Sequence, residues 1–212
     1  MGFSNLSWPA CRRLDRTCLV RLVDLAPYGF VLEPRYWFYG WSRSPRMRLR
    51  RAVSDRLLRA RETLPAGWNF KIWDGYRTYA THVRMVESFR KRLACACPEL
   101  SARRRENLLW RYAGRVRKRV TRPDTHRNGG AVDLTLLDAR GQELDLGTDH
   151  DALVPEAALD FFDRIRRPDP GQREIRDNRR ILARAMAGAG FLRYPPEWWH
   201  WSSREPSPFP SV

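Results

Sequence analysis

The 212-residue chain has few lysines, only four histidines and four cysteines, and no long apolar run. No stretch approaches the ~18 uncharged apolar residues that a membrane-spanning helix needs, so we expect no membrane span. The first twenty residues have no continuous apolar segment, because Arg12, Arg13, Asp15 and Arg16 interrupt it. This pattern argues against a Sec-type signal peptide, and we expect a cytoplasmic protein.

The spacing of the four cysteines does not match that of a cysteine-based zinc site. They occur as Cys11 and Cys18, then as Cys95 and Cys97. Neither pair has the C-x2-C spacing typical of such sites, and a C-x-C pair alone is a weak signal. In a cytoplasmic protein we expect reduced thiols with no chemical role.

Positive charge dominates, with a net charge of +16 and a pI near 10.8. Such an excess is typical of nucleic-acid-binding proteins. However, Arg is spread along the whole chain, which favours a bias in composition over a binding patch. The basic residues of the predicted 98–120 helix accompany an apolar stripe, so we interpret them as the solvated face of a packed helix. We do not expect a nucleic-acid partner, and a basic binding module is only a distant alternative.

The order of the predicted elements indicates an α+β fold. With 42% apolar residues and nine Trp, the chain can form one compact domain over 1–212. Strands and helices do not alternate regularly, which favours a central antiparallel sheet flanked by helices. Apolar runs predict strands at 20–23, 29–32, 70–73, 131–137 and 198–201. Helical periodicity predicts helices at 46–64, 79–96, 98–120, 155–167 and 172–188.

Three short segments hold nearly all of the candidate chemistry, at residues 74–77, 125–133 and 197–200. A catalytic zinc site needs three ligands from His, Asp or Glu and an open position. His126, Asp133 and His200 provide such a set, and Glu197 could serve as the general base. Taken singly, each residue also has a purely structural interpretation, such as a hydrogen-bonded loop histidine.

Taken together, these segments resemble the zinc D-Ala-D-Ala dipeptidases of the vancomycin-resistance type, in peptidase family M15, subfamily D. The family motif S-x-H-x-x-G-x-A-x-D corresponds to 124–133, and its Glu-Trp-Trp-His motif is intact at 197–200. The D-G-Y-R motif lies at 74–77 and D-L-T-L at 133–136. The resemblance covers about 20–203 and implies the hedgehog/D-Ala-D-Ala peptidase-like fold.

The resemblance also implies a role for each matching residue. It implies one zinc ion per chain, with His126, Asp133 and His200 as ligands. Glu197 corresponds to the catalytic base and acid, and Arg77 to the cation that stabilises the developing negative charge on the scissile carbonyl.

Other residues correspond to the substrate-binding positions of the family. Asp151 matches the anchor for the substrate's ammonium group, and Tyr36 belongs to the same pocket. We expect Asp74 to support Arg77 and a zinc-bound histidine from behind. Asp124 replaces the Ser that the family uses near the substrate carboxylate, so that role either moves to an Arg or the substrate differs.

Three further departures from the family affect the predicted pocket. His150 replaces the Phe next to Asp151, Thr78 replaces a Pro, and a loop after Tyr36 is shortened. The aromatic residues 37–41 then either line a differently shaped pocket or pack in the core.

The predicted function is that of a zinc dipeptidase with a small partner, a D-amino-acid dipeptide such as D-alanyl-D-alanine. Its role would lie in peptidoglycan precursor turnover, glycopeptide antibiotic resistance or D-alanine salvage. Two alternatives stay open: a D-Ala-D-Ala or L,D-carboxypeptidase acting on peptidoglycan stems, and a relative that hydrolyses another amide in a biosynthetic pathway. The oligomeric state is left open.

Overall fold

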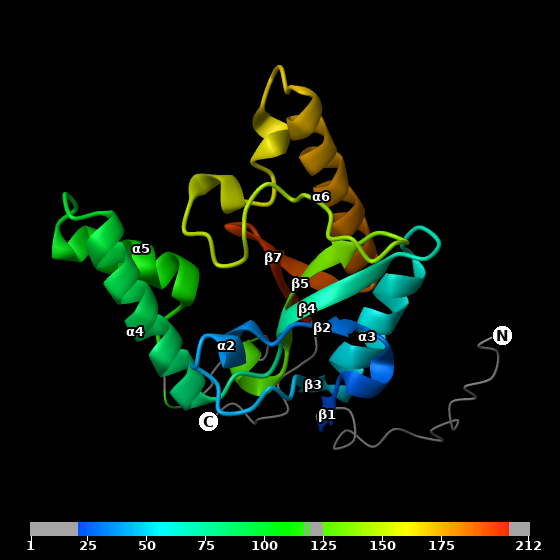
Figure 1. Cartoon of the computed structure of the whole chain (residues 1–212), viewed down its shortest axis with the longest axis horizontal. Coiled ribbons are helices and arrows are strands. Elements are labelled where there is room, and N and C mark those ends of the chain that lie inside the picture. Colours follow the sequence, from blue (N-terminus) through cyan, green and yellow to red (C-terminus); the bar gives the residue numbers. More distant parts are fainter. Residues whose placement is uncertain (1–20, 117, 119–124, 204–212) are drawn as a thin grey trace.

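The computed structural model describes residues 21–116, 118 and 125–203 of the chain (Figure 1). It is an α+β structure built on a five-stranded sheet with the order β2-β4-β5-β7-β6, so the predicted fold class is confirmed. All neighbours in this sheet run antiparallel except β2 and β4, which are parallel. The strands are β2 (Val31–Leu32), β4 (Asn69–Asp74), β5 (Ala131–Leu137), β6 (Phe191–Tyr194) and β7 (Glu197–Ser203). A separate two-stranded sheet pairs β1 (Leu22–Asp24) with β3 (Arg48–Arg50).

The helices divide between two sides of the sheet. In Figure 1, α3 and α6 lie on one side and the α4–α5 pair extends to the other. The helices are α2 (Arg35–Phe38), α3 (Arg51–Glu62), α4 (Tyr79–Ala96), α5 (Ala102–Ala113) and α6 (Pro170–Gly188). The described residues also contain short 3-10 turns: η1 (Ala26–Tyr28), η2 (His126–Asn128), η3 (Pro155–Ala157) and η4 (Phe162–Arg164). Among these residues, every helix is too short or too polar to span a lipid bilayer.

Three predicted helices have different bounds in the structure. The helix predicted at 46–64 begins only at Arg51, because residues 48–50 pair with β1. The helix predicted at 98–120 begins after Ser101, whose hydroxyl accepts a hydrogen bond from the Arg104 N–H, and it ends at Ala113. The segment predicted as a helix at 155–167 contains two 3-10 turns instead.

Two hydrophobic clusters hold these layers together. The larger cluster joins the sheet to α3 and α6, for example through Leu57 and Leu182, both fully buried. The smaller cluster joins α4 to α5 through Phe89 and Leu109, and it includes Tyr36 of α2. The α4–α5 pair therefore has its own small core. It lies on the side of the sheet that carries the segments 74–77, 125–133 and 197–200.

Candidate metal centre and catalytic site

The pairing of the central strands brings the candidate site residues into one row. Asp74 at the end of β4 is paired with Asp133 on β5, and Asp133 is paired with His200 on β7. A register shift between Ile72 and Asp74 accompanies the first pairing. His126 comes from η2, the turn that leads into β5. Residues that lie up to 126 positions apart in the chain thus meet because three antiparallel strands are in register.

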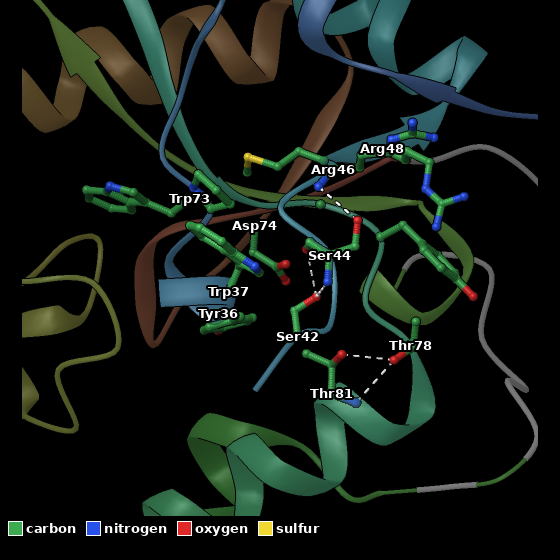
Figure 2. A pocket seen from close by; sticks show the side chains of 14 residues that line it. Tyr36, Trp37, Ser42, Ser44, Arg46, Arg48, Trp73, Asp74, Thr78 and Thr81 are labelled. Carbon is green, nitrogen blue, oxygen red and sulfur yellow. Dashed lines mark hydrogen bonds between the residues drawn. The ribbon is translucent and has the colours of Figure 1, made fainter. Parts of the chain in front are cut away.

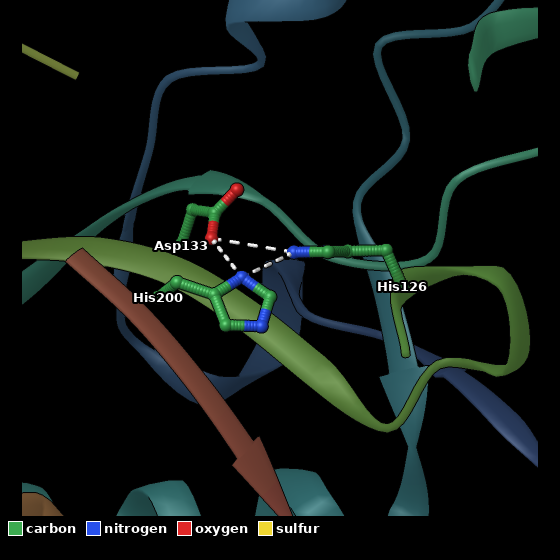
Figure 3. Close-up of side chains that lie close together, drawn as sticks. All are labelled: His126, Asp133 and His200. Carbon is green, nitrogen blue, oxygen red and sulfur yellow. Dashed lines mark hydrogen bonds and ion pairs between the residues drawn. The ribbon is translucent and has the colours of Figure 1, made fainter. Parts of the chain in front are cut away.

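Three side chains converge on one point (Figure 3). His126 Nε2 lies 3.3 Å from Asp133 Oδ1, and His200 Nδ1 lies 3.0 Å from the same oxygen. The two imidazole nitrogens are 3.1 Å apart. The three atoms fall within 4.8 Å of one another, and two nitrogens with one carboxylate oxygen form a ligand set typical of catalytic zinc.

The outer contacts of both imidazoles leave the correct nitrogen free for a metal. His126 Nδ1 lies 2.8 Å from the Gly75 carbonyl oxygen, which can only accept a hydrogen bond, so this nitrogen carries the proton. Nε2 therefore presents a lone pair to the site. His200 Nε2 lies 3.2 Å from the Ser202 hydroxyl, with Nδ1 facing Asp133. Because such outer contacts fix the orientation of metal-ligating histidines, these residues fit a zinc ion.

A glycine-dependent turn places His126. Gly129 has a φ of 74°, in the left-handed region that favours glycine. A Cβ there would collide with the Leu22 side chain and lie 3.1 Å from the Arg50 backbone nitrogen. That nitrogen donates a hydrogen bond to the Gly129 carbonyl oxygen at 3.0 Å. The turn is thus held against β3, and it directs the His126 ring back toward Asp133.

The charges of the cluster are strongly coupled. Burial opposes protonation of His126, but the carboxylates of Asp133 and Asp74 outweigh it and raise its pKa to about 10. Burial likewise acts to raise the pKa of Asp133, yet contacts with His126 and the other two nearby histidines hold it well below its usual value. A cation is therefore favoured at this position, and a metal ion would replace the proton on His126.

Arg77 is buried beside the cluster and held in place by two neighbours. Its Nε and Nη2 lie 3.0 and 2.8 Å from Asp74 Oδ2, and Nη2 donates to the Tyr36 hydroxyl at 3.0 Å. Nη2 is also 3.6 Å from Asp133 Oδ2. Asp74 lies 3.1 Å from His126 Nδ1 as well. Asp74 thus contacts both Arg77 and His126.

Glu197 lies at the start of β7 and is 7% exposed. Its Oε2 is 4.0 Å from His200 Nδ1. Strand residues three apart normally face opposite sides, but the β6–β7 pairing shifts register between Arg193 and Tyr194, at this part of β7. Burial, reinforced by the charges of Asp133 and Asp151, raises the pKa of Glu197 well above its usual value. A carboxylate with a raised pKa accepts a proton more readily than an ordinary one, as a general base must.

Asp151 lies near the other residues of the row and has unusual backbone geometry, with φ of 62°. Its Oδ1 accepts a hydrogen bond from the Tyr36 hydroxyl at 3.4 Å. Its buried Oδ2 has no hydrogen-bond partner among the described residues, although His150 Nδ1 is 3.5 Å away. His150 Nε2 in turn lies 3.4 Å from Asp133 Oδ2. Sequence comparison with the family identifies His150 only as a replacement for Phe and does not predict these contacts.

A cavity of about 550 Å³ opens onto the cluster. Its wall includes Arg77, Asp151 and Glu197, and it continues to α4 and α5, where Met85, Phe89 and Trp110 line it. The sequence does not predict this extension, because it depends on how the α4–α5 pair is placed. Asp124 lies outside the described residues.

A second pocket shares Tyr36 with this cavity but measures only about 60 Å³ (Figure 2). Its hydroxyl groups bind one another, as in the contact of 2.9 Å between Thr78 and Thr81. It is too small for a dipeptide. Trp37 lines it, whereas Phe38 and Tyr39 are 62% and 51% exposed. Trp41 packs edge-on against Phe89, so the aromatic segment after Tyr36 is divided between pocket wall, surface and core.

Comparison with known proteins gives one consistent result. Residues 43–208 match the peptidase M15 family, described as D-Ala-D-Ala dipeptidase. A D-alanyl-D-alanine dipeptidase of Synechocystis is 32% identical over 76% of this chain and 70% of its own. Enzymes of the same name from Streptomyces coelicolor and Enterococcus faecium are 32% and 29% identical over 73% and 75% of this chain, and 72% and 74% of theirs.

Proposed function

This chain belongs to the peptidase M15 family of D-Ala-D-Ala dipeptidases, and from that premise we propose that it is a zinc dipeptidase acting on D-alanyl-D-alanine or a similarly small D-amino-acid dipeptide. The observation that carries the proposal is the convergence of His126, Asp133 and His200 beside two buried groups that suit peptide hydrolysis, Glu197 and Arg77.

In this proposal the three converging side chains hold one Zn²⁺ per chain. When bound, the ion lowers the pKa of water toward ~7 and polarises the peptide carbonyl group. His126 and His200 are already oriented by Gly75 and Ser202, so binding requires little rearrangement of their rings.

Glu197 is the proposed proton carrier. It accepts the proton from the attacking water and returns it to the nitrogen of the leaving D-amino acid. Its location at the cavity wall, with His200 only 4.0 Å away, supports this role. Its burial supports it too, because a raised pKa makes the Glu197 carboxylate a stronger proton acceptor.

Arg77 is proposed to stabilise the negative charge that develops on the scissile carbonyl oxygen. Asp74 and Tyr36 hold its guanidinium group before substrate arrives, so little reorganisation is needed during the reaction. Asp151 is the proposed partner of the substrate's free ammonium group. Its buried Oδ2 has no hydrogen-bond partner among the described residues, and an ammonium donor would satisfy it.

A carboxypeptidase that trims peptidoglycan stems is the second candidate. One observation favours it: the cavity extends from the cluster as far as Trp110 and Tyr112 on α5, which leaves more room than two alanine residues need. A buried acceptor at Asp151 favours the dipeptidase, because a longer substrate has no free ammonium group at that position.

The proposal extends to the subfamily, the extent of the domain and the location of the protein. The motifs at 124–133 and 197–200 support membership of subfamily D, the vancomycin-resistance type. We place residues 1–212 in a single zinc peptidase domain. The unpaired thiols of Cys95 and Cys97 support a cytoplasmic location, where thiols stay reduced.

The test measures D-alanine release by zinc-loaded protein from D-Ala-D-Ala, L-Ala-L-Ala and N-acetyl-D-Ala-D-Ala. The dipeptidase assignment predicts release from the first substrate alone, and at least a ~10²-fold loss of kcat in Glu197→Gln. Release from the N-acetylated substrate as fast as from the free dipeptide would favour the carboxypeptidase. Release from neither D-substrate would refute both assignments.

A further inference from the structure

The wall of the large cavity carries charges of both signs. Asp133, Asp151 and Glu197 make the region around the cluster acidic, whereas Arg115 and Arg127 line the same cavity elsewhere. The two regions have different neighbours. Asp151 contacts Tyr36 and His150, while the Arg127 guanidinium lies over the Tyr79 ring at the start of α4. A dipeptide with a free ammonium group and a free carboxylate carries matching charges at its two ends.

Arg127 differs from the other cations of this cavity because it is partly buried and yet has no carboxylate partner among the described residues. Arg77 is paired with Asp74, and Arg115 is an exposed residue that lies 5.7 Å from the centre of the Trp110 ring. Arg127 is half-buried, and its buried Nε has no hydrogen-bond partner in the part of the chain that the structure describes. Within the described residues, no carboxylate forms an ion pair with it.

An unpaired, partly desolvated guanidinium gains more from an incoming anion than an exposed one does, because water screens the exposed charge. Arg127 also directly follows His126 in the chain, so it occupies the edge of the proposed zinc site. An anionic group bound to it would lie within the same cavity as the scissile bond. The planar guanidinium suits a carboxylate in particular, since it can donate two parallel hydrogen bonds.

We propose that Arg127 binds the C-terminal carboxylate of the substrate and thereby selects dipeptides with a free C terminus. The inference rests on the proposed dipeptidase function and deepens it. It also accounts for the departure at Asp124: where the family has a Ser near the substrate carboxylate, this chain has an acidic residue, and Arg127 supplies the attraction that this position lacks. With the ammonium group at Asp151, the two ends of the dipeptide fix its direction across the cluster.

The test compares D-Ala-D-Ala with its C-terminal amide, using wild-type protein, Arg127→Gln, Arg115→Gln and Arg166→Gln. Arg166 is exposed and lies outside the cavity, so its variant controls for lost positive charge. Arg127→Gln should raise KM for the free acid about 10- to 100-fold, the range for a lost charge-assisted hydrogen bond. Its KM for the amide and its kcat should change little, and Arg166→Gln should behave as wild type.

Two results would overturn the inference. One is loss of the preference for the free acid in Arg115→Gln with retention in Arg127→Gln. The other is an equal rise in KM for acid and amide in Arg127→Gln, which indicates a structural role.

A binding measurement separates failure of this inference from failure of the proposed function. Calorimetry on zinc-loaded Glu197→Gln protein reports affinity for the acid and the amide without turnover. If the acid binds more tightly only while Arg127 is present, the inference stands even when no hydrolysis is found. If the acid and the amide bind equally, the inference fails even where D-Ala-D-Ala is hydrolysed.

Discussion

His82 lines the large cavity and makes the stability of its wall depend on pH. It lies on α4, and its Nε2 donates a hydrogen bond of 2.9 Å to the Ala113 carbonyl oxygen at the end of α5. Burial, and then the positive charge of Arg77, lower its pKa from 6.5 to about 4. The folded protein therefore binds a proton at His82 less readily than the unfolded chain does, and stability falls as pH drops from about 6.5 toward 4.

The magnitude follows from the two pKa values. With one pKa unit equivalent to about 1.4 kcal/mol, lowering the pH from 7 to 5 should remove about 2 kcal/mol of the free energy of unfolding through His82 alone. His82→Gln keeps a donor for Ala113 but does not titrate. In metal-free protein, urea unfolding at both pH values should show that wild type loses about 2 kcal/mol more than this variant. Equal losses in the two proteins would refute the reasoning.

Three further predictions concern the cluster and its supports. Arg77→Lys keeps the positive charge but loses the planar guanidinium group that Asp74 holds. In steady-state assays kcat for D-Ala-D-Ala should therefore fall about 10²- to 10³-fold. A change confined to KM would contradict the proposed role of Arg77. Ser202→Ala removes the outer contact of His200, so calorimetric zinc affinity should fall about 10-fold or more, and unchanged affinity would argue against that contact. Gly129→Ala should lower the free energy of unfolding by more than about 1 kcal/mol in urea denaturation. The reason is that φ at this position is positive and the added Cβ would collide with residues of β1 and β3. A neutral effect would show that the turn can relax.

The residues of the cluster could be predicted from the sequence because the relevant chemistry is local. The 125–133 segment holds two of the three converging residues, together with the glycine that its turn needs at 129. The 197–200 segment holds the third residue, His200, and Glu197, whose carboxylate lies 4.0 Å from it. Short segments of this kind reveal residue types and turns, and the strand pairing then brings them together.

Features that depend on tertiary packing could not be predicted in the same way. Residues 48–50 continue an apolar periodicity that suits a helix, but pairing with β1 places them in a strand. The sequence shows only that His150 replaces a Phe, whereas the structure puts its ring between Asp133 and Asp151. Arg127 is one of many arginines, and it is set apart only by its partly buried place on the cavity wall, where it has no described carboxylate partner.

The central claim is that His126, Asp133 and His200 hold one zinc ion on which hydrolysis of D-Ala-D-Ala depends. The most direct measurement adds Zn²⁺ stepwise to EDTA-treated protein and follows bound metal and D-alanine release together. Both should reach a plateau at one equivalent of zinc per chain, and Asp133→Ala should abolish both. Full D-alanine release without bound metal, or tight zinc binding that survives in Asp133→Ala, would contradict it.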